Sequence, residues 1–194
     1  MKLSRLAVPF LLAAMVLGAG PALAAEPENT MVITLKDGDV TVALRPDLAP
    51  KHVAQIKALV REGAYDNVVF HRVIDGFMAQ TGDVQFGDAE NGFDLRRAGT
   101  GGSDKPDLPA EFSSEKFVRG VVGMARSQDP NSANSQFFIM FAPYPSLDGQ
   151  YTVVGKVESG MDLVDKIKRG SASQNGAVAD PDRMVKVRIA ADPK

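Results

Sequence analysis

The chain has 194 residues, a formal net charge of −2 and no cysteine. This slightly acidic balance does not favour a nucleic-acid binder, and the lack of cysteine excludes disulfides, thiolate nucleophiles and sulfur-ligated metal sites. Only two histidines are present, His52 and His71, which argues against a histidine-rich metal centre.

The first 24 residues have the pattern of a secretory signal peptide. Lys2 and Arg5 precede an apolar run over residues 6–17, and Ala22-Leu23-Ala24 supplies an A-x-A cleavage site. The run is too short to span a bilayer, so we expect cleavage after Ala24 and a periplasmic or secreted protein without a membrane span. Cleavage removes two of the 22 basic and none of the 24 acidic residues, so residues 25–194 carry a formal charge of −4 and suit a single domain.

The chain after residue 30 begins with a predicted β-hairpin and a helix. Two β-rich runs, residues 31–35 and 39–44, are separated by Lys36-Asp37-Gly38, and an Asp-Gly pair is a strong signal for a two-residue turn. An amphipathic helix is predicted over residues 50–62, with Pro50 suited to its first turn and Gly63 to its C-terminal cap. Its apolar face indicates that it lies on the core.

The stretch from Phe70 to Gln80 is the most informative part of the chain. Its first half is a predicted strand, whose alternation places Arg72 on the same face as Val68, Phe70 and Ile74, opposite Val69, His71 and Val73. A guanidinium is costly to desolvate, so an arginine there indicates either a structural ion pair or a ligand site. Gly76 turns the chain, and the next residues add an aromatic ring, a thioether and an amide beside the cation: Phe77, Met78 and Gln80.

A long segment over residues 82–105 is rich in Gly, Asp and Asn, which predicts a turn-rich surface loop. Within it Gly99-Thr100-Gly101-Gly102-Ser103 could be taken for a phosphate cradle. No Lys-Ser/Thr pair opens a helix after it and no G-x-G-x-x-G register fits, so phosphate binding is not expected.

A second informative run covers residues 135–141. By alternation Gln136, Phe138 and Met140 share one face, whereas the opposite face is wholly apolar, with Phe137, Ile139 and Phe141. This pattern predicts a strand with a core on one side and a site on the other.

Further strands are predicted over residues 118–125, 151–157 and 184–189. A second helix is predicted over residues 161–169, with Ser159 as a possible cap and Gly170 at its end. Many short strands and only two helices indicate a mainly antiparallel all-β domain, either a sandwich or a barrel.

Motifs in order over nearly all of residues 25–194 resemble the cyclophilin family of peptidyl-prolyl cis-trans isomerases, closest to its bacterial exported (periplasmic) members. The matching segments are Ala49-Pro50-Lys51, Phe70-His71-Arg72-Val73-Ile74, Gly76-Phe77-Met78-Ala79-Gln80, Gly82-Asp83, Gly99-Thr100-Gly101-Gly102, Gly123-Met124-Ala125, Asn134-Ser135-Gln136-Phe137-Phe138-Ile139, Leu147-Asp148-Gly149 and Val154-Gly155-Lys156-Val157. The resemblance implies a closed eight-stranded antiparallel β-barrel capped by two α-helices. It also implies an enzyme without cofactor or metal that rotates X–Pro bonds of proline-containing polypeptides and assists the folding of exported proteins.

Carried over onto matching positions, the resemblance implies a set of site residues. The catalytic arginine falls on Arg72, and Gln80 and Gln136 match the amides that hold this arginine and the substrate backbone. The remaining positions imply substrate contacts: a proline pocket at Phe77, Met78, Phe138 and Leu147, a peptide-pairing edge at Ala125 and Arg126, and an aromatic wall at Tyr151.

The chain departs from the family pattern at several positions. Ser146 stands where the family often has Trp, and Tyr151 where it often has His. Because that indole belongs to cyclosporin binding in the family, we expect weak inhibition by the drug. Arg126 replaces a common Asn whose backbone does the binding, so the change should be tolerated and could alter the preference for charged peptides. The loop between Gly82 and Gly99 is longer than in compact members.

Three other interpretations stay open from the sequence. Ser113-Ser114-Glu115-Lys116 fits the S-x-x-K pattern of penicillin-recognising enzymes, although K-T-G is absent. His71, near Asp75 and Asp83, could act as a general base, but a hydrogen-bonded structural histidine is the expected role, since no nucleophile accompanies it. The chain could also be a non-catalytic chaperone module that binds proline-containing segments. For the isomerase that the resemblance implies, we expect a monomer.

Overall fold

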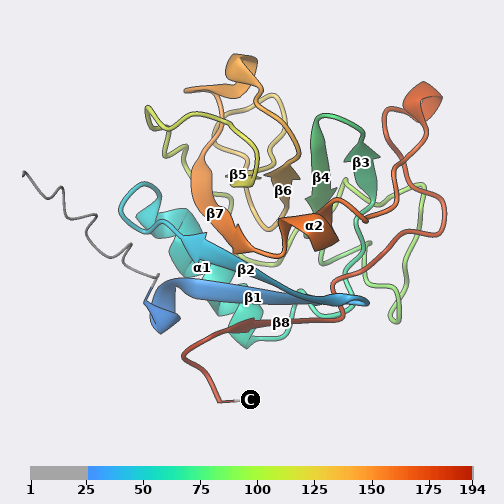
Figure 1. Ribbon diagram of the computed structural model, residues 1–194, viewed down its shortest axis with the longest axis horizontal. Helices are drawn as coiled ribbons and strands as arrows, with labels where there is room; N and C mark the ends of the chain where they lie inside the picture. The colour runs from blue at the N-terminus through green and yellow to red at the C-terminus, as the bar shows by residue number, and fades with distance from the viewer. Residues whose placement is uncertain (1–25, 194) are drawn as a thin grey trace, which may run out of the picture.

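The computed structural model describes residues 26–193, so the predicted signal peptide lies outside the described residues. Eight antiparallel strands form one sheet of order β3-β4-β6-β5-β7-β2-β1-β8 (Figure 1). The strands are β1 (Thr30–Leu35), β2 (Gly38–Leu44), β3 (Arg72–Ile74), β4 (Met78–Thr81), β5 (Val121–Met124), β6 (Phe137–Met140), β7 (Val153–Ser159) and β8 (Lys186–Ile189). The helices are α1 (Pro50–Arg61) and α2 (Met161–Val164), with short 3-10 turns η1 (Pro27–Asn29), η2 (Pro145–Leu147) and η3 (Ala172–Gln174).

The sheet is an open half-barrel, so the prediction of a closed barrel is wrong. In the described chain the edge strands β3 and β8 form no ladder with each other, and the segments before them meet at an isolated bridge between Val69 and Arg183. Pro181 offers no N–H to a partner strand, and Asp180 has a positive φ of 53° that interrupts extended backbone. A continuous closing ladder therefore does not form there.

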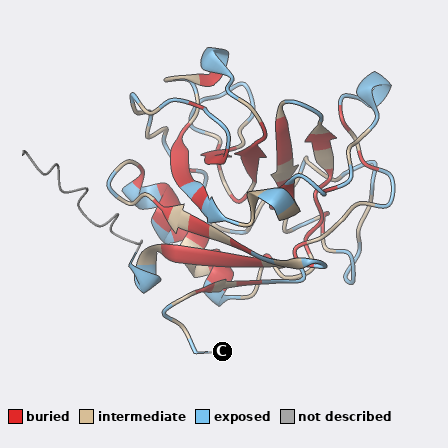
Figure 2. Cartoon of the chain, in the orientation of Figure 1, coloured by how far each residue is buried: buried red, intermediate tan, exposed pale blue. Residues whose placement is uncertain are grey.

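The predicted hairpin and first helix are confirmed. Leu35 pairs with Gly38, so Lys36 and Asp37 form the two-residue connection between β1 and β2. Helix α1 has Pro50 in its first turn and is followed by Gly63 with a φ of 71°. Its buried face packs on the sheet, as the buried positions of α1 in Figure 2 show.

The second helix is much shorter than predicted, because α2 ends at Val164. Ser159 is the last residue of β7 and does not cap α2; the N-cap is Gly160, whose φ of 86° belongs to the left-handed region. After α2 the N–H groups of Lys166 and Ile167 still bond within the turn, to Leu163 and Val164. From Lys168 on the backbone bonds to distant partners: the N–H of Lys168 donates to the Asp182 carboxylate and that of Gly170 to the Val73 carbonyl. These tertiary bonds replace the last helical turns.

Two hydrophobic clusters lie on opposite faces of β6, as predicted. Phe137, Ile139 and Phe141 belong to the main core between the sheet and α1. The second cluster, here called the site cluster, consists of Met78, Phe117, Val121, Phe138, Met140, Leu147 and Val153. The alternation of side chains along β6 therefore places the closed main core on one face of the strand and the site cluster on the other.

The alternation predicted for residues 68–74 is only partly right. Val68 and Phe70 lie in the main core, but Val73 joins them there, while Ile74 packs on the site cluster. The strand is irregular before β3 begins at Arg72, so the faces exchange between Phe70 and Arg72. This irregularity turns Arg72 away from the main core.

The segment over residues 82–105 is a loop without α-helix or ladder strand, as predicted. It is organised around the buried carboxylate of Asp83, which accepts hydrogen bonds from the N–H groups of Gln85, Phe86, Gly99 and Gly101. A Cβ at Gly101 would lie 2.5 Å from Asp83 Oδ1, so only glycine fits there. The amides that could have bound a phosphate are thus used by the protein's own carboxylate.

Candidate active site

Three adjacent strands place the key side chains in one row. Arg72 on β3 pairs with Gln80 on β4, and Gln80 pairs with Phe138 on β6. Phe138 in turn pairs with Gly123 on β5, where a Cβ would lie 2.6 Å from the rings of Phe117 and Phe138. Glycine at this position leaves room for the aromatic ring that forms the floor of the site.

An open cavity of about 190 Å³ lies over this row. Its lining contains nine of the ten residues that the sequence placed in a site: Arg72, Phe77, Met78, Gln80, Ala125, Arg126, Phe138, Leu147 and Tyr151. The tenth, Gln136, lines a neighbouring cavity and contacts Gln80. The structure therefore brings together residues from five separate segments of the chain.

The floor of this cavity is apolar and rigid. Met78, Phe138 and Leu147 are buried, while Phe77 and Tyr151 are half-buried walls. The Phe138 ring packs against Phe117 and against the edge of Tyr151, in both cases with centroids 5.8 Å apart. Such packing holds the ring in place and leaves one of its sides to the cavity.

Arg72 stands at the edge of this floor with its guanidinium held by neutral groups. Its Nη1 donates to Gln80 Oε1 at 3.2 Å, and its Nε and Nη2 donate to the main-chain and side-chain oxygens of Asn175 at 3.0 and 3.1 Å. No carboxylate pairs with it among residues 26–193, so the structural ion pair is excluded. Partial burial lowers the pKa of Arg72, but a guanidinium stays charged and has five N–H groups, so a donor remains for a ligand.

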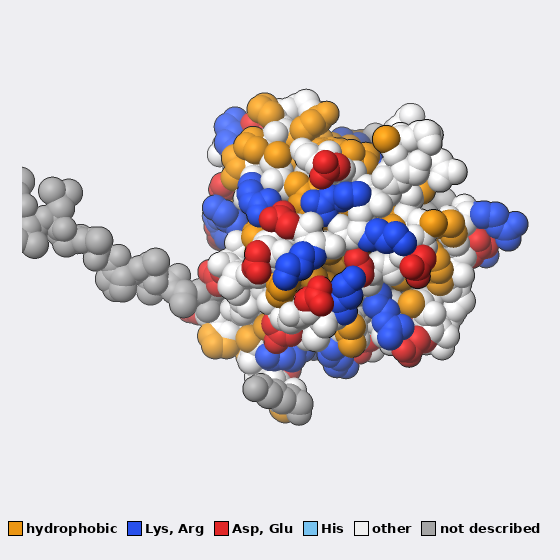
Figure 3. Space-filling model, turned by 45° about the vertical axis from the view of Figure 1, so that its right-hand side comes forward, with side chains coloured by type: hydrophobic (Ala, Val, Ile, Leu, Met, Phe, Trp, Pro, Cys, Tyr) orange, Lys and Arg blue, Asp and Glu red, His pale blue; other side chains and the backbone are white. Residues whose placement is uncertain are grey.

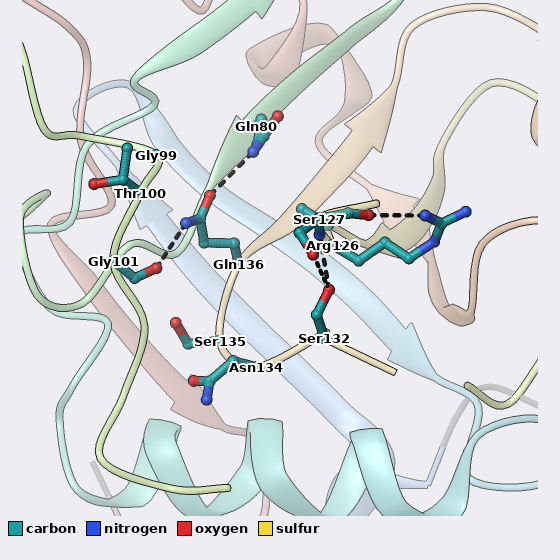
Figure 4. Close-up of a pocket in the computed structure, with 11 residues that line it drawn as sticks. Gln80, Gly99, Thr100, Gly101, Arg126, Ser127, Ser132, Asn134, Ser135 and Gln136 are labelled. Carbon is teal, nitrogen blue, oxygen red and sulfur yellow. Dashed lines mark hydrogen bonds between the residues drawn. The ribbon is translucent and has the colours of Figure 1, made fainter. Parts of the chain in front are cut away.

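The two glutamines form a relay that fixes the arginine. Gln80 Nε2 donates to Gln136 Oε1 at 3.0 Å, and Gln136 Nε2 donates to the Gly101 carbonyl at 2.8 Å (Figure 4). Each amide therefore has its orientation set by the next, and the oxygen of Gln80 is left facing Arg72. The loop organised by Asp83 thus supports the far end of this relay.

A second cavity, of about 260 Å³, shares Gln80, Ala125 and Arg126 with the first. Figure 4 shows the residues that line this second cavity. Amide and hydroxyl side chains dominate its lining, which consists of Gln80, Gly99, Thr100, Gly101, Ala125, Arg126, Ser127, Ser132, Asn134, Ser135 and Gln136. At its edge the N–H of Ala125 donates to the Gln136 carbonyl, while the N–H of Arg126 has no partner in the described chain. A peptide carbonyl could occupy that free donor.

His71 does not have the role expected of it. It is 4% exposed, yet neither ring nitrogen makes a hydrogen bond of good geometry to a described residue; the nearby Val69 carbonyl accepts from Thr81 Oγ1 instead. Burial lowers the pKa of His71 to about 4, so the ring is neutral at pH 7. Without a partner to orient it or a nucleophile to activate, it does not form a general-base system.

The S-x-x-K segment is also not a catalytic pair. Lys116 is exposed and lies 3.2 Å from the Asp148 carboxylate, and the Ser113 hydroxyl accepts from the N–H of Glu115. Within residues 26–193 we find no cluster of acidic and histidine side chains suited to a metal ion, and no helix long and apolar enough to cross a membrane.

Asn175 is the contact that the sequence analysis missed. It has a φ of 52°, and this left-handed conformation turns both its oxygens toward the guanidinium of Arg72. The η3 segment lies beside β3 (Figure 1), where Arg72 and Ala177 form a bridge. The only signal in the sequence was the Asn175-Gly176 pair, which indicates a turn but not its position.

Comparisons with known proteins agree with this geometry. Residues 30–189 match the family described as cyclophilin type peptidyl-prolyl cis-trans isomerase/CLD. A probable peptidyl-prolyl cis-trans isomerase of Brucella suis is 72% identical over 173 residues, which cover 89% of this chain and 88% of the relative. An Arabidopsis thaliana isomerase is 35% identical, with 86% of this chain and 73% of the relative covered.

Two solved structures have the same fold. A cyclophilin from Hirschia baltica is 27% identical with a TM-score of 0.70, and the match covers 88% of this chain and 77% of that one. A cyclophilin type isomerase from Cryptosporidium parvum, crystallised in the presence of the dipeptide Ala-Pro, is 27% identical with a TM-score of 0.71, covering 84% and 99%.

Proposed function

The chain belongs to the cyclophilin-type family and is a peptidyl-prolyl cis-trans isomerase, and we propose that Arg72, together with the apolar cavity beside it, carries the catalysis. The observation that supports this most directly is a guanidinium without a carboxylate partner at the rim of a cavity lined by Phe77, Met78, Phe138 and Leu147. Such a cavity suits a proline ring, and the free N–H suits an acceptor on the imide.

The chemical problem is rotation about a bond with partial double-bond character, which imposes a barrier of roughly 20 kcal/mol. At the half-rotated transition state conjugation is lost, and the prolyl nitrogen gains a basic lone pair. A fixed donor such as Arg72 binds this nitrogen better than it binds the planar imide, which lowers the barrier. Arg72 can also donate to the carbonyl of the proline residue.

The arginine alone does not supply the whole effect. An acceleration of about five decades requires roughly 7 kcal/mol, whereas one charge-assisted hydrogen bond contributes about 1.5–3 kcal/mol. The remainder comes from holding the ring on the Phe138 floor while the preceding carbonyl rotates, and from excluding water that stabilises the planar amide. No covalent step is involved.

The decisive test measures isomerisation of an Ala-Ala-Pro-Phe peptide by exchange NMR, without a coupling protease. We expect Arg72→Ala to lower kcat/KM by roughly 10- to 150-fold with the fold intact, because one charge-assisted donor is lost. Arg188→Ala on β8, at the other edge of the sheet, is a matched control that should keep full activity. Near-normal turnover by Arg72→Ala would refute the assignment, and binding without turnover by the wild type would favour a chaperone module.

We propose further that the enzyme is exported and assists the folding of exported proteins as a monomer. Support comes from the basic, apolar and small-residue order of residues 1–24. Cell fractionation and the N-terminal sequence of the mature protein test this: a cytoplasmic protein that retains Met1 would contradict it.

We also propose weak cyclosporin inhibition. Ser146, in the exposed turn η2 beside Leu147, offers no indole donor to the drug. Nanomolar inhibition in the same NMR assay would contradict this expectation.

A further inference from the structure

Most arginines of the described chain are paired with a carboxylate, whereas the two at the site are not. Figure 3 shows basic and acidic side chains interspersed on one face, and ion pairs join a carboxylate to each of Arg45, Arg61, Arg96, Arg119, Arg169 and Arg183. By contrast, Arg72 and Arg126 are the two charged residues that line the apolar cavity, and neither has a carboxylate partner in the described chain. No carboxylate side chain is among the residues that line the polar cavity either, so Arg72 and Arg126 carry the only formal charges in the linings of the two cavities.

Arg126 is held in a fixed position by neutral groups. Its Nη2 donates to the Gln150 carbonyl at 3.0 Å. Its Nη1 donates to the Ser127 carbonyl at 2.8 Å, a bond that Figure 4 shows. Its guanidinium carbon lies 4.5 Å from the centre of the Tyr151 ring, which forms one wall of the apolar cavity. These contacts fix the cation beside the cavity without neutralising its charge, since carbonyls and an aromatic ring carry no formal charge.

The backbone of the same residue indicates which part of a substrate would lie beside it. Ala125 and Arg126 extend the chain beyond the end of β5, past the floor of the cavity, and the N–H of Arg126 has no partner among the described residues. A substrate segment that leads into the proline pocket can pair with this extension, as a strand adds to a sheet. The residue directly before the proline then lies next to the Arg126 side chain.

We propose that Arg126 determines specificity at the residue before proline, so that this isomerase prefers Asp–Pro and Glu–Pro bonds and disfavours Lys–Pro bonds. The inference rests on the proposed function of Arg72 and its cavity, and it identifies the substrates as proline segments with an acidic residue before the proline. The contribution is electrostatic: a carboxylate beside a preformed cation gains from the pair without the cost of ordering the arginine.

The experiment compares three peptides, Ala-Glu-Pro-Phe, Ala-Ala-Pro-Phe and Ala-Lys-Pro-Phe, by exchange NMR with wild-type enzyme. We expect kcat/KM for the glutamate peptide to exceed that for the alanine peptide by roughly two- to fivefold, and the lysine peptide to fall below it by a similar factor. The ratio between glutamate and lysine peptides should shrink at high salt, because exposed charges are screened.

Variants separate charge from shape. With Arg126→Gln, kcat/KM should be nearly the same for the three peptides. Arg126→Lys keeps the charge and should retain most of the preference for the glutamate peptide over the lysine peptide. Arg188→Gln on β8 removes the same charge away from the site and should leave the ratios unchanged.

Equal rates for all three peptides with active wild-type enzyme would overturn the specificity inference alone. A preference that survives both Arg126→Gln and high salt would also overturn it, since the preference would then have another origin. No acceleration of any peptide would overturn the proposed function, and the inference with it. Even if a variant fails to fold, the wild-type ratios and their salt dependence show whether the site discriminates between these peptides by charge.

Discussion

The two faces of β6 differ in what closes them. Phe137 is fully buried in the main core, where its ring meets the edge of Tyr65 at 5.6 Å and α1 covers the cluster. Phe138, the next residue, packs on Phe117 but has the open cavity on its other side. The same aromatic residue therefore stabilises the fold on one face and forms a binding floor on the other.

Polar groups follow the same division. In the main core the Tyr65 hydroxyl donates to the Ser135 carbonyl at 2.7 Å, and Thr81 donates to the Val69 carbonyl at 2.9 Å. At the site, Arg72 keeps a donor free and Arg126 keeps its backbone N–H free. These two hydroxyl groups of the main core are satisfied internally, whereas the site leaves donors for a ligand.

The largest expected effect on stability comes from a substitution on the face of β6 that packs in the main core. Phe137→Ala should lower the free energy of unfolding by about 3–5 kcal/mol, because it opens a cavity in a sealed core. Phe138→Ala should cost less stability, about 1–3 kcal/mol, because it widens a cavity that already exists, but should lower kcat/KM roughly 10- to 100-fold. Urea denaturation and the NMR assay measure both quantities. If Phe137→Ala and Phe138→Ala lost equal stability and Phe138→Ala kept normal turnover, the division of β6 into a structural face and a binding face would be contradicted.

The next effect concerns His71, which lies buried under Gly99 between the two regions. Burial lowers its pKa to about 4, below the unfolded value of about 6.5, so the unfolded chain binds more protons between these values. The stability contribution is full above pH 6.5 and is lost as the pH falls, with a loss of about 2–3 kcal/mol by pH 4.5.

Urea denaturation at pH 7.0, 5.5 and 4.5 measures this dependence. A His71→Leu variant should show a flatter profile over the same range, since most carboxylates of the unfolded chain titrate only near or below its lower end. A wild-type stability that does not change between pH 7.0 and 4.5 would show that the buried imidazole does not stay neutral.

The smallest effect concerns the support of Arg72. Asn175→Gly keeps the left-handed backbone and the main-chain carbonyl but removes the Oδ1 acceptor. We expect kcat to fall about three- to tenfold with little change in KM, because one of the hydrogen bonds that orient the guanidinium is lost while the bond to the main-chain carbonyl remains.

Asn67→Gly is the matched control for this variant. Asn67 has a similar φ of 61°, but its side chain donates to Glu90 and not to the site, so kcat should stay unchanged. A rise in KM with unchanged kcat for Asn175→Gly would instead show that Asn175 binds substrate directly.

Several predictions from the sequence depended on local pattern and were confirmed for that reason. The turn between β1 and β2, the helix after Pro50 and the two faces of β6 are each set by residues within one segment. The prediction failed for the end of α2 because the N–H of Gly170 bonds to Val73, nearly a hundred residues earlier in the chain. Likewise the prediction of a closed barrel failed, because the positive φ of Asp180 and the missing N–H of Pro181 interrupt the ladder that would close it.

By itself the sequence determined the strand pattern, the family motifs and the identity of the residues that line the apolar cavity. Only the tertiary structure decided that Arg72 is held by Asn175, 103 residues away in the chain, and that the buried ring of His71 has no hydrogen-bond partner within residues 26–193. It also decided that Arg126 lies over Tyr151 and pairs with no carboxylate among the described residues. The physical reason is that periodicity reports which face a residue occupies, whereas partners and charge balance depend on which distant segments the fold brings to that face.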